Sequence, residues 1–84
     1  MDIAALRAQA KHIQPIVRIG KGGISDSLLA EIGKQLKKRK LIKVRFLQSF
    51  VGLYDTRDAA DRITEETGSR IIHQVGNTVV LYHE

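Results

Sequence analysis

The sequence contains no cysteine. A disulfide framework, a thiol nucleophile and a cysteine-ligated zinc site are therefore excluded, and an intracellular, cytoplasmic location is expected. A long hydrophobic run is also missing near the N-terminus, because Arg7 and Lys11 interrupt the segment 1–13. This segment resembles neither a signal peptide nor a membrane span, so we expect no membrane partner.

Known catalytic and cofactor-binding patterns are missing too. The glycine cluster at 20–23 lacks the spacing and the Lys-Ser/Thr pair of a Walker loop, and Ser25 stands where a dinucleotide motif needs its third glycine. His12, His73 and His83 do not have metal-ligand spacing, and the acidic residues of 55–66 are typical of a solvated helix face. We expect no catalytic site, cofactor, metal or small-molecule substrate.

Aromatic residues are scarce, with two phenylalanines, two tyrosines and no tryptophan. Phe46 is expected in the core. Phe50 and Tyr54 fall in a predicted loop region, where burial against the sheet edge is the favoured interpretation and stacking on a nucleobase is the alternative.

Acidic residues are absent from the middle of the chain. Residues 32–54 carry seven basic and no acidic side chains, whereas 1–31 carry four basic and three acidic, and 55–84 carry three basic and six acidic. Such a block is typical of a surface that binds a polyanion, because an ordinary helix face mixes both signs. Its members are Lys34, Lys37, Lys38, Arg39, Lys40, Lys43 and Arg45.

The cluster Gly20-Lys21-Gly22-Gly23 lies between a predicted strand and a predicted helix. Its glycines allow positive φ angles and a close approach of the backbone to a ligand. Loop N–H groups, the positive end of the helix and the Lys21 ammonium together suit a phosphate, as in the loop with which KH modules hold a nucleic-acid backbone. A tight structural turn with an incidental lysine is the alternative.

Hydrophobic periodicity and capping residues predict three helices and four strands. The helices are expected at 3–12, 26–40 and 56–67, and the strands at 16–19, 41–47, 69–75 and 78–83. The expected N-caps are Asp2, Ser25 or Asp26, and Asp55 or Thr56. Segment 48–54 is expected to be a loop or a frayed strand end, and Gly76-Asn77 predicts a two-residue hairpin turn.

This order predicts an α+β fold, a two-layer α-β-α-β-α-β-β arrangement with a four-stranded mixed sheet, in a single domain spanning 1–84. The helix between the first two strands implies that these strands are parallel. In the second helix, leucine and isoleucine side chains form one apolar stripe with Lys34 and Lys38 opposite. If the helices cover one face of the sheet, the other face is open, and Arg18, Lys43 and Arg45 could line it.

Three stretches of the sequence carry a family pattern: IVRIGKGGIS (16–25), SLLAEIGKQLKKRKLIKVRF (27–46) and ETGSRIIHQVGNTVVLY (66–82). Together they resemble the CRM domain in its single-domain, YhbY-like form. That family shows a strand, a Gly-x-x-Gly loop, a helix, a second strand with Leu-Ile-Lys-Val and a closing hairpin, in this order. The likeness covers nearly the whole chain.

The resemblance implies a fold similar to the C-terminal domain of translation initiation factor three. It also implies RNA binding, with structured ribosomal RNA or the pre-ribosomal large subunit as the expected partner during ribosome assembly. The predicted RNA-binding residues are Gly20, Lys21, Gly22, Gly23, Lys34, Lys37, Lys38, Arg39, Lys43 and Arg45. A protein-interaction module that binds an acidic partner, and DNA binding, are the alternatives.

Overall fold

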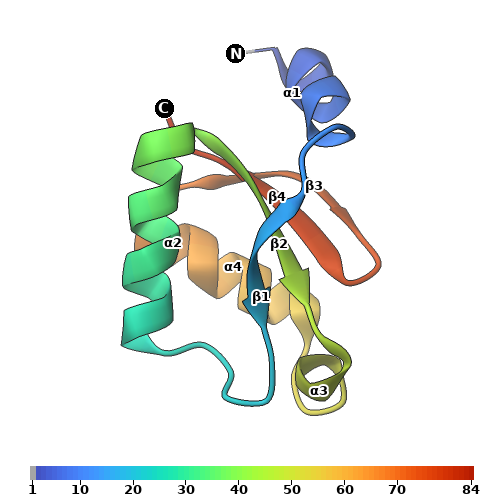
Figure 1. Ribbon diagram of the computed structural model, residues 1–84, viewed down its shortest axis with the longest axis vertical. Helices are drawn as coiled ribbons and strands as arrows, with labels where there is room; N and C mark the ends of the chain where they lie inside the picture. The colour runs from blue at the N-terminus through green and yellow to red at the C-terminus, as the bar shows by residue number, and fades with distance from the viewer. Residues whose placement is uncertain (1) are drawn as a thin grey trace.

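The computed structural model describes residues 2–84, which contain four helices and four strands (Figure 1). The helices are α1 (Ile3–Ala10), α2 (Asp26–Arg39), α3 (Gln48–Val51) and α4 (Thr56–Thr67). The strands are β1 (Pro15–Ile19), β2 (Leu41–Phe46), β3 (Arg70–Val75) and β4 (Thr78–Tyr82). They form one sheet in the order β1-β2-β4-β3, in which only β1 and β2 are parallel neighbours. The predicted α+β class and mixed four-stranded sheet are confirmed.

Side-chain caps determine where three of the helices begin. The Asp2 carboxylate accepts a hydrogen bond at 3.1 Å from the N–H three residues later and starts α1. Ser25, rather than Asp26, caps α2 with its hydroxyl, and Asp55, rather than Thr56, caps α4. Each cap satisfies an N–H group that has no partner inside its helix, so the helix starts are determined locally by the sequence.

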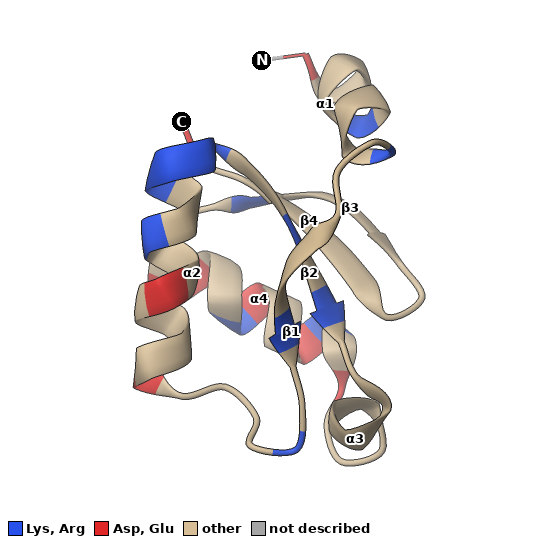
Figure 2. Cartoon of the chain, in the orientation of Figure 1, with Lys and Arg blue, Asp and Glu red and all other residues tan. Residues whose placement is uncertain are grey.

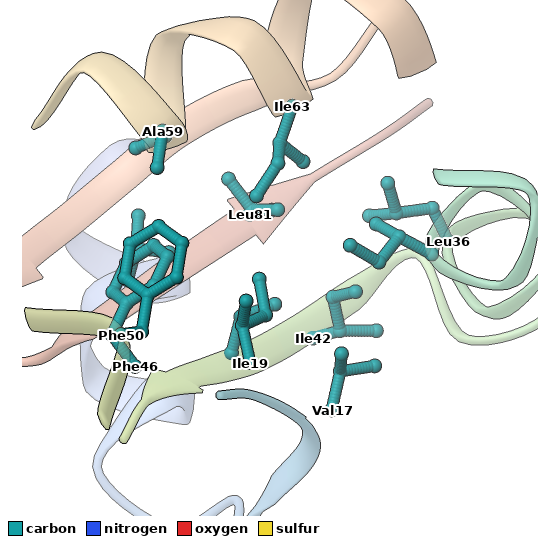
Figure 3. Packing of buried hydrophobic residues seen from close by; sticks show 13 residues of the cluster. Val17, Ile19, Leu36, Ile42, Phe46, Phe50, Ala59, Ile63 and Leu81 are labelled. Atoms are coloured by element: carbon teal, nitrogen blue, oxygen red, sulfur yellow. The ribbon is translucent and has the colours of Figure 1, made fainter. Parts of the chain in front are cut away.

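The main core lies on the face of the sheet that α2 and α4 cover (Figure 3). Ile42, Val44 and Phe46 alternate along β2 and are all buried on this face. From α2, Ile32 and Leu36 are buried against them, which confirms the predicted apolar stripe. The other buried members of this core are Val17, Ile19, Phe50, Ala59, Ala60, Ile63, Val79 and Leu81.

Helix α1 packs on the opposite face of the sheet and covers only part of it. A small second cluster joins Ala10 of α1 to Ile72 and Val80 of the hairpin, with Leu6 and Tyr82 at its margin. The predicted two layers therefore gain a partial third layer, because the few apolar side chains of α1 have their partners on β2, β3 and β4. The rest of this face is not covered by α1, and its arginines Arg18 and Arg45 are exposed.

The prediction for segment 48–54 is wrong, because it contains the short helix α3 instead of only a loop or a frayed strand end. Phe50 explains this helix: its side chain is only 1% exposed, and its ring stacks on Phe46 with centroids 5.1 Å apart (Figure 3). One helical turn after β2 brings Phe50 back under the sheet. Four residues are too few for a periodic pattern in the sequence.

The closing hairpin is confirmed. Gly76 has a φ of +57°, which a two-residue primed turn requires at its first central position. The other predicted boundaries agree with the observed ones to within two residues, and both ends of α4 were predicted correctly. Among residues 2–84, the structure has no helix with both the length and the apolar character needed to cross a membrane. Nor do these residues contain three or more His, Asp or Glu side chains grouped for metal binding.

Candidate nucleic-acid interface

The glycine loop forms a tight turn between β1 and α2. The Gly23 N–H donates a hydrogen bond to the Gly20 carbonyl at 2.9 Å, and Gly23 has a φ of +71°. Residues with a Cβ rarely adopt this conformation, so the turn requires glycine at position 23. Neither Gly20 nor Gly22 has a positive φ. The conformational need for glycine is therefore confined to the end of the loop.

The three loop glycines have different surroundings. A Cβ at Gly20 would lie 3.2 Å from the Ser49 hydroxyl of α3, and a Cβ at Gly23 would lie 3.4 Å from the Tyr54 hydroxyl. At Gly22, a Cβ would have nothing within 4 Å. Gly22 therefore exposes bare backbone at the tip of the loop, in a depression that Asp55 and Asp58 also line.

The N-terminus of α2 is less available to a phosphate than the sequence predicts. The Ser25 hydroxyl already accepts the Leu28 N–H at 3.1 Å. Asp26 then adds a carboxylate to the first helical turn. The Ser25 hydroxyl and the Asp26 carboxylate thus already interact with the positive end of α2. A phosphate at the loop must therefore be bound mainly by the loop residues.

The basic residues of α2 lie toward its C-terminal end, away from the glycine loop (Figure 2). At a rise of 1.5 Å per residue, Lys38 lies about 18 Å along the helix axis from Asp26. Arg39 donates to Gln35 at 3.1 Å, and Gln35 donates to Glu31 at 3.0 Å. The loop and the α2 cations, which the sequence placed in one site, are therefore two separate regions.

Lys34 and Lys37 lie on the side of α2 that faces α4. They line a shallow depression that Asp26 and Glu66 also line. Opposite charges next to these two lysines lower the positive potential there. All four cations are exposed, but Lys38 and Arg39 do not line this depression with its acidic residues, so they form the more available part of the α2 basic region.

Lys43 and Arg45 project from the sheet face opposite α2, because their neighbours Val44 and Phe46 are buried beneath the helices. In the parallel register, Arg45 pairs with Arg18 of β1, and both are exposed. Two adjacent guanidinium groups repel each other, and a bound anion would relieve this repulsion.

The arginine pair lies at the end of β1 and β2 that adjoins the glycine loop (Figure 2). Arg18 precedes Lys21 by only three residues. The structure thus brings the loop together with Arg18 and Arg45 instead of with the α2 lysines. Arg18 is absent from the predicted RNA-binding residues, because its pairing with Arg45 depends on a strand register that the sequence does not specify.

Phe50 and Tyr54 have different environments. The predicted burial is confirmed for Phe50, whereas Tyr54 is 49% exposed and the prediction is wrong for it. The Tyr54 ring packs on the Phe50 ring with centroids 4.8 Å apart, and it borders Gly23. Tyr54 thus supports the glycine loop with one side of its ring and keeps the rest open to solvent.

Known proteins share the sequence pattern and the fold of this chain. The family model described as CRS1 / YhbY (CRM) domain matches residues 2–83. The Bacillus subtilis protein named "Probable RNA-binding protein YqeI" is 39% identical over 79 residues, which cover 94% of this chain and 80% of that one. A Methanocaldococcus jannaschii protein, also named as a probable RNA-binding protein, is 32% identical over 92% of this chain and 57% of its own. The solution structure of a hypothetical Staphylococcus aureus protein, a candidate RNA-binding protein by its description, matches with a TM-score of 0.79 and 36% identity, over 98% of this chain and 83% of that chain.

Proposed function

The chain belongs to the CRS1 / YhbY (CRM) domain family, and on that premise we propose that it is a non-catalytic RNA-binding protein. The resemblance carried by its three sequence stretches is thereby confirmed. Two relatives have RNA binding in their names, and the similar solved structure has it in its description. The proposal extends this property to the present chain.

One arrangement carries the proposal: the bare backbone of Gly22 and the exposed Lys21 lie beside the like-charged pair of Arg18 and Arg45. A phosphate at the loop tip would accept hydrogen bonds from the backbone N–H groups of Lys21 and Gly22. The Lys21 ammonium group would attract it as well. Neighbouring phosphates would lie against the arginine pair, whose planar guanidinium groups match phosphate geometry. The negative charge of the RNA phosphates would offset the repulsion between the two arginines and attract both.

The remaining basic residues extend this surface in two directions. Lys43 continues it along β2, and Lys34, Lys37, Lys38 and Arg39 form a second region toward the far end of α2. An RNA that contacts both the loop and the α2 region must span much of the molecule, which favours a structured RNA over a short single strand. The proposed partner is structured ribosomal RNA during assembly of the large subunit, as the family resemblance implies. The proposed contact residues are Gly20, Lys21, Gly22, Gly23, Lys34, Lys37, Lys38, Arg39, Lys43 and Arg45, with Arg18 added.

A competition experiment tests this function against an acidic protein partner. The purified protein is titrated with a labelled ribosomal RNA hairpin, and poly-glutamate of matched total charge is added as competitor. Poly-glutamate should displace the hairpin poorly, because its carboxylates do not match the phosphate spacing and its side chains are flexible. Equal competition would favour a protein-interaction module. A DNA duplex of the same stem sequence is the second competitor, since phosphate contacts alone do not separate RNA from DNA.

A further inference from the structure

A cleft of about 610 Å³ lies between the end of α1 and the sheet face that carries Lys43. Arg7, Lys11 and Lys43 contribute three positive charges to its lining, which includes no acidic residue. Val75 and Val80 contribute apolar surface. The cleft thus combines cationic groups with an apolar floor, unlike the depression beside α2 with its mixed charges.

The floor of the cleft contains one row of residues across three strands. Lys43 of β2 pairs with Val80 of β4, and Val80 pairs with His73 of β3, where the register of β3 shifts between Ile71 and His73. Side chains of directly paired residues project from the same face of a sheet. An ammonium group, an apolar side chain and an imidazole therefore lie side by side, and all three residues line the cleft.

Arg7 forms part of the α1 side of the cleft and is held in place. Its Nε donates a hydrogen bond to the Ile72 carbonyl at 3.1 Å. Ile72 immediately precedes His73, so the guanidinium is anchored close to the strand that carries the imidazole. Arginine and histidine both offer planar groups on which unstacked RNA bases stack. Phosphate binding alone requires neither an anchored planar group nor an apolar floor.

We infer that this cleft binds a single unpaired nucleotide of the RNA, with its base against Arg7 and His73 and its phosphate near Lys43 and Lys11. The inference rests on the proposed RNA binding and adds the readout of a splayed base. The cleft volume lies in the usual range for small-ligand pockets, about 300–1,000 Å³, so a nucleotide fits. An acidic peptide would match the charges but would leave the planar groups unused.

The cleft adjoins the basic surface near the glycine loop. Lys43 and Arg45 are two residues apart on β2, so they project from the same face about 7 Å apart. Arg45 pairs with Arg18, and β1 leads directly into the loop. An RNA strand held at the loop can therefore follow Arg18, Arg45 and Lys43 to the cleft.

The test uses the 84-residue chain and three RNA hairpins with the same stem. One hairpin is fully paired, one has a single-nucleotide bulge, and one has an abasic ribose at the bulge. We expect the bulged hairpin to bind about tenfold more tightly than the other two, since one stacked base contributes on that order. Equal affinity for the bulged and abasic hairpins would overturn the inference.

Two variants assign the preference to the cleft. Arg7→Lys keeps the charge but removes the planar guanidinium, and His73→Ala removes an exposed imidazole. Each should reduce the preference for the bulge to below about threefold and leave the affinity for the paired hairpin within about twofold. The matched control is Arg70→Lys, at an exposed β3 arginine that lines a different depression, and it should keep the full preference.

The outcomes separate this inference from the function on which it rests. If the bulge preference survives in both cleft variants, with both folded by circular dichroism, the base binds elsewhere and the inference is wrong. Binding of all three hairpins with equal affinity would likewise exclude the cleft as a base-binding site, while the RNA-binding function would stand. If the wild-type protein binds none of them, the proposed RNA-binding function fails as well.

Discussion

Replacing Gly22 with aspartate is expected to abolish much of the RNA binding without harming the fold. A side chain at this position meets no atom within 4 Å, and the backbone does not need a positive φ there. Stability should therefore stay within roughly 0.5 kcal/mol of wild type. The carboxylate would stand where a phosphate is proposed to bind, so binding should weaken by about 1–3 kcal/mol through repulsion and a lost charge-assisted hydrogen bond. This range corresponds to about a five- to 150-fold rise in Kd.

Two alanine variants separate charge from conformation in the same loop. Gly22→Ala should keep most of the affinity and stabilise the protein by roughly 0.4–1 kcal/mol, because it restricts the unfolded chain at a compatible position. Gly23→Ala should cost about 1–2 kcal/mol of stability, since the φ of +71° is strained for alanine.

Thermal melts and fluorescence-anisotropy titrations with a labelled ribosomal RNA hairpin, at one fixed salt concentration, measure both properties for all three variants. A folded Gly22→Asp protein with wild-type affinity would refute the reasoning, because the loop would then be only a structural turn. If Gly22→Ala destabilised the protein and Gly23→Ala did not, position 22 instead of position 23 would be the one that requires glycine.

Three further predictions concern the rest of the surface and the core. Lys38→Ala, on exposed α2, should weaken RNA binding less than Gly22→Asp and reduce the salt slope of log K by about one, with unchanged melting; a slope equal to wild type would remove Lys38 from the interface. Arg45→Gln should weaken binding but not lower the melting temperature, because it relieves repulsion from Arg18, and clear destabilisation would contradict this. Phe50→Ala should cost about 3–5 kcal/mol in urea unfolding, since its ring is 1% exposed and stacks on Phe46. A cost below about 1 kcal/mol would be inconsistent with that packing.

Local signals in the sequence predicted most of the secondary structure. Helix α2 has a serine cap, an apolar stripe and a polar outer face within 14 residues, and these features agree with one another. The hairpin was predictable because Gly76 supplies the positive φ of its turn. In contrast, α3 exists because Phe50 reaches the core formed by distant residues, and no local pattern of four residues records that contact.

The composition of the candidate site was easier to predict than its arrangement. Lys21 and Gly22 are exposed at a turn, as their loop sequence indicates. The grouping of cations depends on topology: the length of α2 separates Lys38 from the loop, and the β1–β2 register brings Arg18 beside Arg45. The packing of α1 on the second sheet face, which creates the cleft near Arg7, depends on long-range contacts that have no periodic signature in the sequence.

The salt dependence of RNA binding tests the central claim most directly. If the RNA backbone is held by about four to six phosphate contacts on this surface, log K should fall linearly with log salt concentration at a slope between about −3 and −5. Anisotropy titrations of one ribosomal RNA hairpin over a series of potassium chloride concentrations give this slope. A value near zero would contradict the claim that the glycine loop and the neighbouring arginines bind RNA through its phosphates.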